Sequence, residues 1–133
     1  GNPIHVSDRD FKSSLLSTAY CCYEKSLAEG CFRVSEILYP RINDIRRIGT
    51  AALELSLMAE GAGELYFEIR LSPWDHAAAL TILAEAGGCY TGIGGDVRFD
   101  GPSPVLAANS EENLALLSEA VNEVYRGRVP YRS

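Results

Sequence analysis

The fold is decided by residues 64–88, ELYFEIRLSPWDHAAALTILAEAGG, which predict a β-strand that runs directly into an α-helix. Over residues 64–71 apolar side chains alternate with more polar ones, and this period of two is typical of a strand. We expect an apolar face and a polar face, made respectively by Leu65, Phe67, Ile69 and Leu71, and by Glu64, Tyr66, Glu68 and Arg70. Residues 75–86 have almost no polar face, which predicts a helix buried on more than one side.

Strands and helices alternate along the rest of the chain. We predict strands at residues 4–7, 14–20, 44–48, 89–91 and 105–108, helices at 23–38, 50–60 and 110–125, and a loop rich in Gly and Pro at 92–104. This alternation predicts an α/β fold with a mainly parallel sheet flanked by helices. The 133 residues are expected to form a single domain.

Composition narrows the possible functions. A net charge of -6 argues against a nucleic-acid partner, because phosphate backbones are bound by clustered Lys and Arg. No apolar run approaches the ~20 residues needed to cross a bilayer, and residues 1–10 lack a signal-peptide pattern, so we expect no membrane partner and a cytoplasmic protein. The four cysteines, Cys21, Cys22, Cys31 and Cys89, form no C-x-x-C pair. Reduced thiols are therefore expected, with a zinc site as the minor alternative.

Three places along the chain could carry chemistry. In α/β sheets, ligands bind beyond the carboxyl ends of strands, where the next helices begin. Gly49, Thr50 and Ala51 form one such junction, where free amides favour an anion or a substrate hydroxyl. From the residues alone, a plain helix cap is the favoured interpretation. Asp75 opens the helix after Trp74, as an N-cap or as an oxygen ligand for Mg²⁺. Glu68 is either a solvated strand residue or a site residue.

The sequence contains no complete catalytic motif of its own. It has no G-x-S-x-G nucleophile elbow and no Walker-type phosphate loop. A self-contained hydrolase or nucleotide-binding enzyme is therefore not indicated.

Five motifs, in order and at matching spacing, resemble the second half of an inositol monophosphatase. They are residues 47–53 (RIGTAAL), 60–61 (EG), 65–68 (LYFE), 74–78 (WDHAA) and 85–88 (EAGG). Residues 105–109 and the helix after them are similar to the closing strand and helix of the family. The resemblance covers nearly the whole chain and is weakest over residues 20–40.

This resemblance implies the C-terminal half of a layered αβαβα sugar-phosphatase fold. The activity implied is that of a Mg²⁺-dependent, Li⁺-sensitive phosphomonoesterase, in which a metal-activated water attacks phosphorus. Asp75 matches the family's metal-binding aspartate and Glu68 the glutamate that binds substrate hydroxyls. Gly49, Thr50 and Ala51 match the helix start that faces the substrate. The expected partners are a small phosphorylated substrate, the N-terminal half of the enzyme and a second copy in a homodimer.

The chain also departs from the family pattern. The D-P-[IL]-D-G-T motif and an upstream glutamate, which supply the other metal ligands, are missing, and residues 1–4 resemble the segment that follows that half. Ala79 replaces a glycine usual in the family. We therefore expect the metal-binding N-terminal half to be absent. The turn at residues 72–75 (SPWD) favours inositol or sugar phosphates over nucleotides as substrates, and histidinol phosphate stays open. The alternative is a non-enzymatic α/β interaction or dimerisation module.

Overall fold

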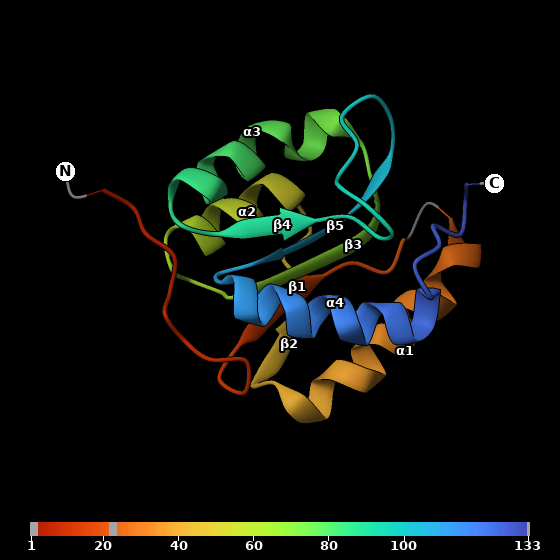
Figure 1. The fold of residues 1–133 in the computed structure, drawn as a ribbon, viewed down its shortest axis with the longest axis horizontal. Helices are drawn as coiled ribbons and strands as arrows, with labels where there is room; N and C mark the ends of the chain where they lie inside the picture. The colour runs from red at the N-terminus through yellow and green to blue at the C-terminus, as the bar shows by residue number, and fades with distance from the viewer. Residues whose placement is uncertain (1–2, 22–23, 133) are drawn as a thin grey trace.

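The computed structural model describes residues 3–21 and 24–132, and its elements alternate as expected (Figure 1). The strands are β1 (Leu15–Thr18), β2 (Asp44–Arg46), β3 (Leu65–Leu71), β4 (Cys89–Thr91) and β5 (Ser103–Ala108). The helices are α1 (Ala28–Leu38), α2 (Ala51–Ala59), α3 (Pro73–Glu85) and α4 (Glu111–Tyr125), with short 3-10 helices at Lys25–Leu27 and Tyr39–Arg41. Gly1, Asn2, Cys22, Tyr23 and Ser133, with the predictions made for them, lie outside the described residues.

The strands form one mixed sheet in the order β2-β1-β3-β5-β4. β1 is parallel to β2 and to β3, whereas β5 is antiparallel to both β3 and β4. β4 consequently runs in the same direction as β1, β2 and β3, so the expected α/β class is confirmed and the sheet is parallel in all but β5. β5 reverses direction because a loop, and no helix, connects it to β4.

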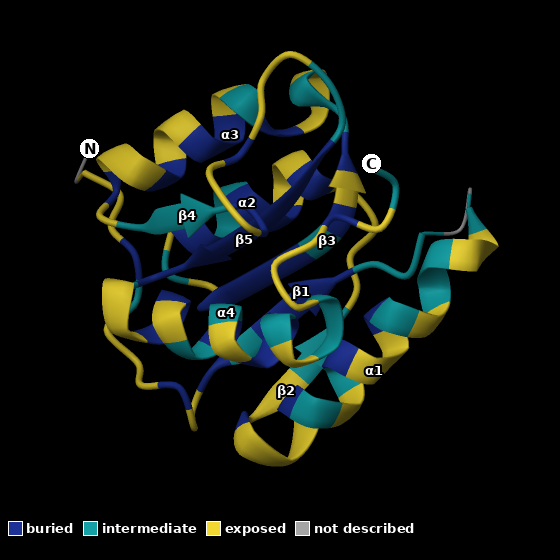
Figure 2. Cartoon of the chain, turned by 45° about the vertical axis from the view of Figure 1, so that its right-hand side comes forward, coloured by how far each residue is buried: buried dark blue, intermediate teal, exposed yellow. Residues whose placement is uncertain are grey.

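Helices cover both faces of the sheet, and each face has its own core. α2 and α3 pack together on one face, and α1 and α4 lie on the other (Figure 1). β5, most of β1 and most of β3 are buried between them, whereas the outer strands β2 and β4 are partly exposed (Figure 2). Leu16, Phe67 and Leu117 belong to the core under α1 and α4, whereas Leu55, Tyr66 and Leu80 belong to the core under α2 and α3. Full burial of side chains of this size stabilises the fold by about 1.5–3 kcal/mol each.

The polar face expected for β3 is only partly open to solvent: Glu64 and Tyr66 are buried, Glu68 is half-buried and Arg70 is exposed. Tyr66 is fully buried against α2 and α3, while Leu65, Phe67 and Ile69 are buried on the opposite face. The register of β3 against β5 shifts between Glu68 and Leu71, and Leu71 packs in the Tyr66 core instead of the Phe67 core. A bulge of this kind moves later side chains to the other face of the sheet.

Three further predictions about elements need correction. α3 buries only His76, Ala79, Leu80 and Leu83, because it packs on α2 and the sheet and leaves its outer side exposed. Residues 4–7 form no strand; the Val6 amide donates to the Ala86 carbonyl at 3.0 Å, so this segment is attached to the end of α3 instead. The predicted helix at 23–38 starts as a 3-10 turn and becomes α-helical only at Ala28.

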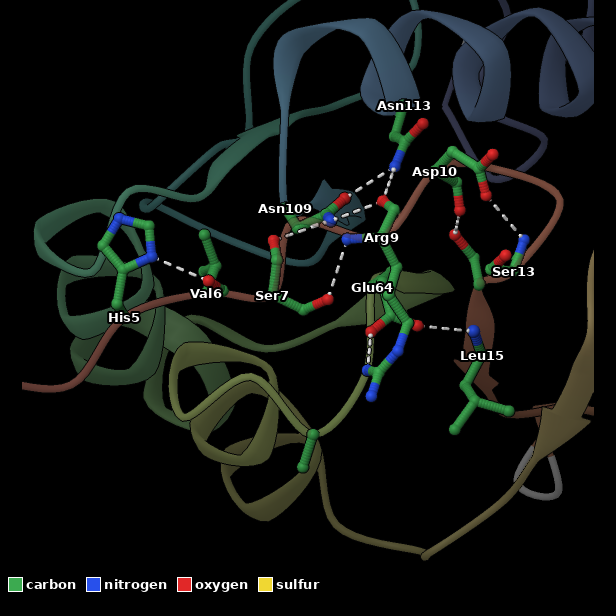
Figure 3. Close-up of polar contacts among 12 residues, drawn as sticks. His5, Val6, Ser7, Arg9, Asp10, Ser13, Leu15, Glu64, Asn109 and Asn113 are labelled. Atoms are coloured by element: carbon green, nitrogen blue, oxygen red, sulfur yellow. Dashed lines mark hydrogen bonds and ion pairs between the residues drawn. The ribbon is translucent and has the colours of Figure 1, made fainter.

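The segment before β1 is held across the edge of the sheet by a buried carboxylate (Figure 3). Glu64, whose side chain is 0% exposed, accepts a hydrogen bond from the Leu15 amide at 2.8 Å and an ion-pair contact from Arg9 at 2.9 Å. The amide nitrogens of Asn109 and Asn113 donate to the Arg9 carbonyl at 3.0 and 3.1 Å. These contacts join residues 7–15 to β3 and α4.

Within the described residues, no helix combines the length and apolar character that a bilayer crossing requires.

Candidate active site

A pocket of about 430 Å³ opens where β1, β2 and β3 end. These three strands are parallel neighbours, so their carboxyl ends meet at one edge of the sheet, the usual position of a ligand site in α/β folds. The pocket is lined by Ala19, Cys21, Glu24, Arg47, Gly49, Glu54, Glu68, Arg70, Leu71, Ser72, Asp75 and Pro102. Of the predicted site residues, Gly49, Glu68 and Asp75 are therefore brought together.

Thr50 and Ala51 do not line this pocket. Thr50 is the exposed N-cap of α2, and its hydroxyl makes no capping hydrogen bond. Ala51 is buried in the core between α2 and α3, where its methyl group packs. The start of α2 thus contributes to the pocket through Gly49 and not through the two residues that follow it.

Glu54 holds the backbone turn at residues 48–49, called the Gly49 corner below, and the sequence did not single this residue out. Its carboxylate is buried and accepts hydrogen bonds from the amides of Ile48 at 2.8 Å and Gly49 at 3.2 Å. Gly49 has φ +109°, which only glycine adopts without strain, so the chain can turn there towards the pocket. The available signal was that Glu54 is the single charged residue in the otherwise apolar run 51–59.

Glu68 lies in the pocket with a perturbed carboxyl group. Burial raises the pKa of Glu68 from its usual 4.5 to about 7, and the negative charges of Glu54 and Asp75 act in the same direction. The guanidinium of Arg47 opposes this rise. A half-buried acid among two other carboxylates is not a solvated strand residue, and shifts of this kind concentrate at functional sites.

Tyr66, two residues earlier on β3, is a second residue that the sequence did not single out. Its hydroxyl is buried and, among the described residues, lacks a hydrogen-bond partner of normal geometry. Burial holds the pKa of Tyr66 well above its usual range, with Glu68, Glu54 and Asp75 adding to the effect. The neutral hydroxyl lies near enough to Glu68 to influence its titration.

Asp75 occupies the first turn of α3 but is not its N-cap. The N-cap is Ser72, and Pro73 takes the first helical position, so Asp75 lies three residues into the helix. The capping interpretation of Asp75 is therefore wrong. Its carboxylate forms no hydrogen bond within the described part of the chain, and it borders the pocket that holds Glu68. Trp74 does not shield it, because that side chain is 85% exposed.

Arg70 lines the same pocket as Glu68. Its guanidinium pairs with Glu24 at 2.8 Å and lies 5.1 Å from the ring centre of Tyr131. The Tyr131 hydroxyl in turn donates to the Ile69 carbonyl at 2.8 Å. Arg70 is therefore held in place from two sides and connects β3 to the segment that follows β1.

The residues offer oxygen ligands but not a closed metal site. Across residues 3–21 and 24–132, no three His, Cys, Asp or Glu side chains are grouped so that they could hold a metal ion. Asp75 presents a carboxylate without a hydrogen-bonding partner in the described chain, which suits a hard cation such as Mg²⁺ as one ligand among several. The pocket can thus contribute a metal ligand and bind a polar molecule.

Comparison with known proteins places the chain in a family. The model of the inositol monophosphatase family matches residues 1–126. The Nus factor SuhB of Xylella fastidiosa is 33% identical over 129 residues, covering 92% of this chain and 47% of that protein. The inositol-1-monophosphatase of Bacillus subtilis is 40% identical over 83 residues, covering 62% of this chain and 31% of that protein.

Solved structures agree with the sequence comparisons. The inositol monophosphatase of Anabaena superimposes with a TM-score of 0.75 at 32% identity, over 92% of this chain and 48% of that structure. The fold is therefore that of the C-terminal half of such enzymes. The chain spans about half the length of the curated relatives it matches. On these grounds, this chain belongs to the inositol monophosphatase family.

Proposed function

We propose that this chain supplies one half of the active site of a Mg²⁺-dependent, Li⁺-sensitive phosphomonoesterase that acts on inositol phosphates or related sugar phosphates. The observation that carries the proposal is the meeting of Gly49, Glu68 and Asp75 in one pocket at the carboxyl ends of three parallel strands. Family membership supports the reaction class. The pocket's volume of about 430 Å³ suits a small polar substrate.

Asp75 is the residue proposed to bind the metal. When bound, Mg²⁺ supplies the positive charge that stabilises phosphoryl oxygens during hydrolysis. Asp75 fits the role of a ligand because the rigid first turn of α3 holds its carboxylate at the pocket. A single carboxylate gives low Mg²⁺ affinity, so the remaining ligands must come from the N-terminal half of the fold.

Glu68 is proposed to orient the substrate by accepting hydrogen bonds from its hydroxyl groups. It does so best as the carboxylate, which has two acceptor oxygens and no donor. Arg47, at the same pocket, stabilises that charged form. Gly49 keeps its backbone close to the substrate because Glu54 ties its amide into the corner. Thr50 carries a hydroxyl, free of capping, beside this corner.

The proposed partners follow from the incomplete site. The N-terminal half of the same enzyme would close the pocket over Asp75, and a second copy would complete a homodimer. A cytoplasmic location is part of the proposal, since it suits the reduced thiols expected from the sequence.

A second function is favoured by the name of several relatives. The X. fastidiosa protein and its counterparts in other bacteria are called Nus factor SuhB, so a relative can carry a name that is not that of a phosphatase. The alternative is thus a non-enzymatic module that uses the fold for interaction or dimerisation. Under this alternative the pocket residues have no catalytic duty.

The test is phosphate release by a protein in which this chain follows an N-terminal half of the family. Inositol monophosphate, a sugar phosphate and a nucleotide 3'-phosphate are compared as substrates across a Mg²⁺ titration, with and without Li⁺. We expect hydrolysis that requires Mg²⁺, is inhibited by Li⁺ and is fastest with inositol or sugar phosphates. Absence of hydrolysis from a folded protein with bound Mg²⁺ would favour the interaction module.

A further inference from the structure

Arg70 brings a positive charge to a pocket whose charged lining is mostly acidic. The carboxylates that line the pocket are those of Glu24, Glu54, Glu68 and Asp75, and the guanidinium groups are those of Arg47 and Arg70. A substrate with an added negative charge is repelled by the carboxylates and attracted by the guanidinium groups. Arg47 stabilises the Glu68 carboxylate, which leaves Arg70 as the cation without an assigned part. The Arg70 side chain is 42% exposed, so a molecule in the pocket can reach it.

Two contacts order the Arg70 guanidinium. Its Nη1 donates to the Glu24 carboxylate at 2.8 Å, and its central carbon lies 5.1 Å from the centre of the Tyr131 ring. The ring is itself fixed, because the Tyr131 hydroxyl donates to the Ile69 carbonyl at 2.8 Å. Immobilising a free arginine side chain costs rotamer entropy, and these contacts have already ordered this one. Arg70 can therefore bind an anion at a smaller entropic cost than a free surface arginine.

Most of the Arg70 donors are not used by the contacts that order it. A guanidinium has five N–H bonds, and within residues 3–21 and 24–132 the Arg70 side chain donates a single hydrogen bond, to Glu24. The Tyr131 ring contacts the charged plane and takes up no N–H bond. The remaining N–H bonds can meet two oxygens of one carboxylate or phosphate. Ser72, which lines the same pocket, adds a hydroxyl that does not cap α3.

The spacing along β3 relates Arg70 to the substrate contact proposed for Glu68. Both side chains line the pocket, and they lie two residues apart on the strand. At about 3.3 Å per residue, this spacing is about 7 Å, comparable with the width of a sugar or inositol ring. A ring whose hydroxyl groups contact Glu68 can therefore bring a substituent from its far side to Arg70.

We propose that Arg70 is a specificity-determining residue, which selects polyol phosphates that carry a second anionic group, a carboxylate or a phosphate, on the ring. The second group pairs with the guanidinium through charge-assisted hydrogen bonds, and the Ser72 hydroxyl is a further donor. Tyr131 is the positioning residue that keeps the guanidinium at the pocket. Selection of this kind rests on the proposed function, since it assumes that Glu68 contacts the hydroxyl groups of the same substrate.

Three hexose phosphates that differ only at the hydroxymethyl position test the assignment. Glucose 1-phosphate is neutral at that position, glucuronic acid 1-phosphate carries a carboxylate there, and glucose 1,6-bisphosphate carries a phosphate. Isothermal titration calorimetry measures the Kd of each for the protein in which this chain follows an N-terminal half of the family. EDTA is present, so that binding is measured without Mg²⁺-dependent turnover. We expect at least one of the doubly charged compounds to bind about 10-fold more tightly than glucose 1-phosphate.

Matched variants assign this preference to its residues. Arg70→Gln should reduce it from about 10-fold to about 2-fold or less, and Arg70→Lys, which keeps the charge without the fork, should be intermediate. Tyr131→Leu should weaken the preference, whereas Tyr131→Phe keeps the ring beside Arg70 and should retain most of it. The exposed Arg128→Gln, after α4, is the control and should change no Kd. A preference that survives in Arg70→Gln, or that is lost only in Arg47→Gln, would overturn the proposal.

The outcomes also separate this selectivity from the proposed hydrolysis. If the Kd preference depends on Arg70 but Mg²⁺ restores no turnover, the proposed hydrolysis is wrong and the anion contact stands. If Mg²⁺ restores turnover while the three compounds have equal Kd values, the anion contact is wrong and the hydrolysis stands. Failure of the wild type to bind either doubly charged compound would likewise overturn the assignment of Arg70.

Discussion

Glu68 is the residue whose titration most directly reports the character of the pocket. Its pKa of about 7 in the folded chain exceeds the usual 4.5, so the folded state binds this proton more tightly than the unfolded state. The group therefore stabilises the fold below pH 4.5, and that stabilisation is lost as pH rises from 4.5 through 7.

We predict that Glu68→Gln removes this loss. Between pH 4.5 and 8, the unfolding free energy of the wild type should fall by about 2–3 kcal/mol relative to the variant. Urea unfolding of both chains at several pH values measures the difference. If the difference in unfolding free energy between the wild type and Glu68→Gln does not change with pH, Glu68 titrates like a surface acid.

The same substitution tests the proposed contact with substrate hydroxyls. In a protein with both halves, Glu68→Gln keeps the size of the side chain but replaces one acceptor oxygen with a donor. We expect KM to rise at least as much as kcat falls, because the contact is made in both ground and transition states. Steady-state kinetics with inositol monophosphate measure KM and kcat. An unchanged KM would contradict the proposed contact between Glu68 and the substrate hydroxyls.

The turn from β2 into α2 depends on a buried carboxylate. Replacing Glu54 with alanine leaves the amides of Ile48 and Gly49 without their acceptor and loosens the Gly49 corner. We predict a loss of about 1–3 kcal/mol in unfolding free energy for Glu54→Ala, and a smaller loss for Glu54→Gln, whose carbonyl oxygen can still accept. Urea titration measures both, with the exposed Glu119→Ala on α4 as the control. Equal unfolding free energies for Glu54→Ala and Glu119→Ala would refute the role of Glu54 in holding the turn.

Local patterns predicted most of the elements but not their surroundings. The strand at 64–71 and the helices at 50–60 and 110–125 follow from periodicity and were confirmed within one or two residues at each end. The burial of Tyr66 was missed, because alternation along β3 reports two faces and cannot tell that helices cover both. The bulge that turns Leu71 to the other face has no marker in the sequence, since register depends on the β5 partner.

The packing of the whole chain depends on a contact between segments far apart in sequence. Glu64 joins the Leu15 amide and Arg9, 49 and 55 residues away, at the edge of the sheet (Figure 3). We predict that Glu64→Ala lowers the unfolding free energy by about 2–3 kcal/mol, because it leaves the buried amide unpaired and frees the segment before β1. In contrast, Arg98→Ala, which breaks the surface pair with Asp100, should produce no measurable change. Unfolding curves that coincide for the two variants would contradict this account.

How the site assembles could be predicted only in part from the sequence. Asp75, Glu68 and Gly49 were found because strand ends in α/β folds gather ligands and because the family motifs match. Glu54 was not, since its role depends on the backbone amides of Ile48 and Gly49 becoming its neighbours when β2 leads into α2. Asp75 was also taken as a candidate N-cap. The structure gives that position to Ser72, because the helix starts at Pro73, two residues earlier than predicted.

The most direct measurement of the central claim is Mg²⁺-dependent phosphate release by Asp75→Asn in a protein with both halves. Asp75 makes no hydrogen bond within the described residues and caps no helix, so its loss should change stability by less than about 1 kcal/mol. If it binds the metal, kcat should fall by orders of magnitude and half-maximal activity should require more Mg²⁺. The exposed Asp8→Asn should behave like the wild type. Wild-type turnover and Mg²⁺ dependence in Asp75→Asn would contradict the account.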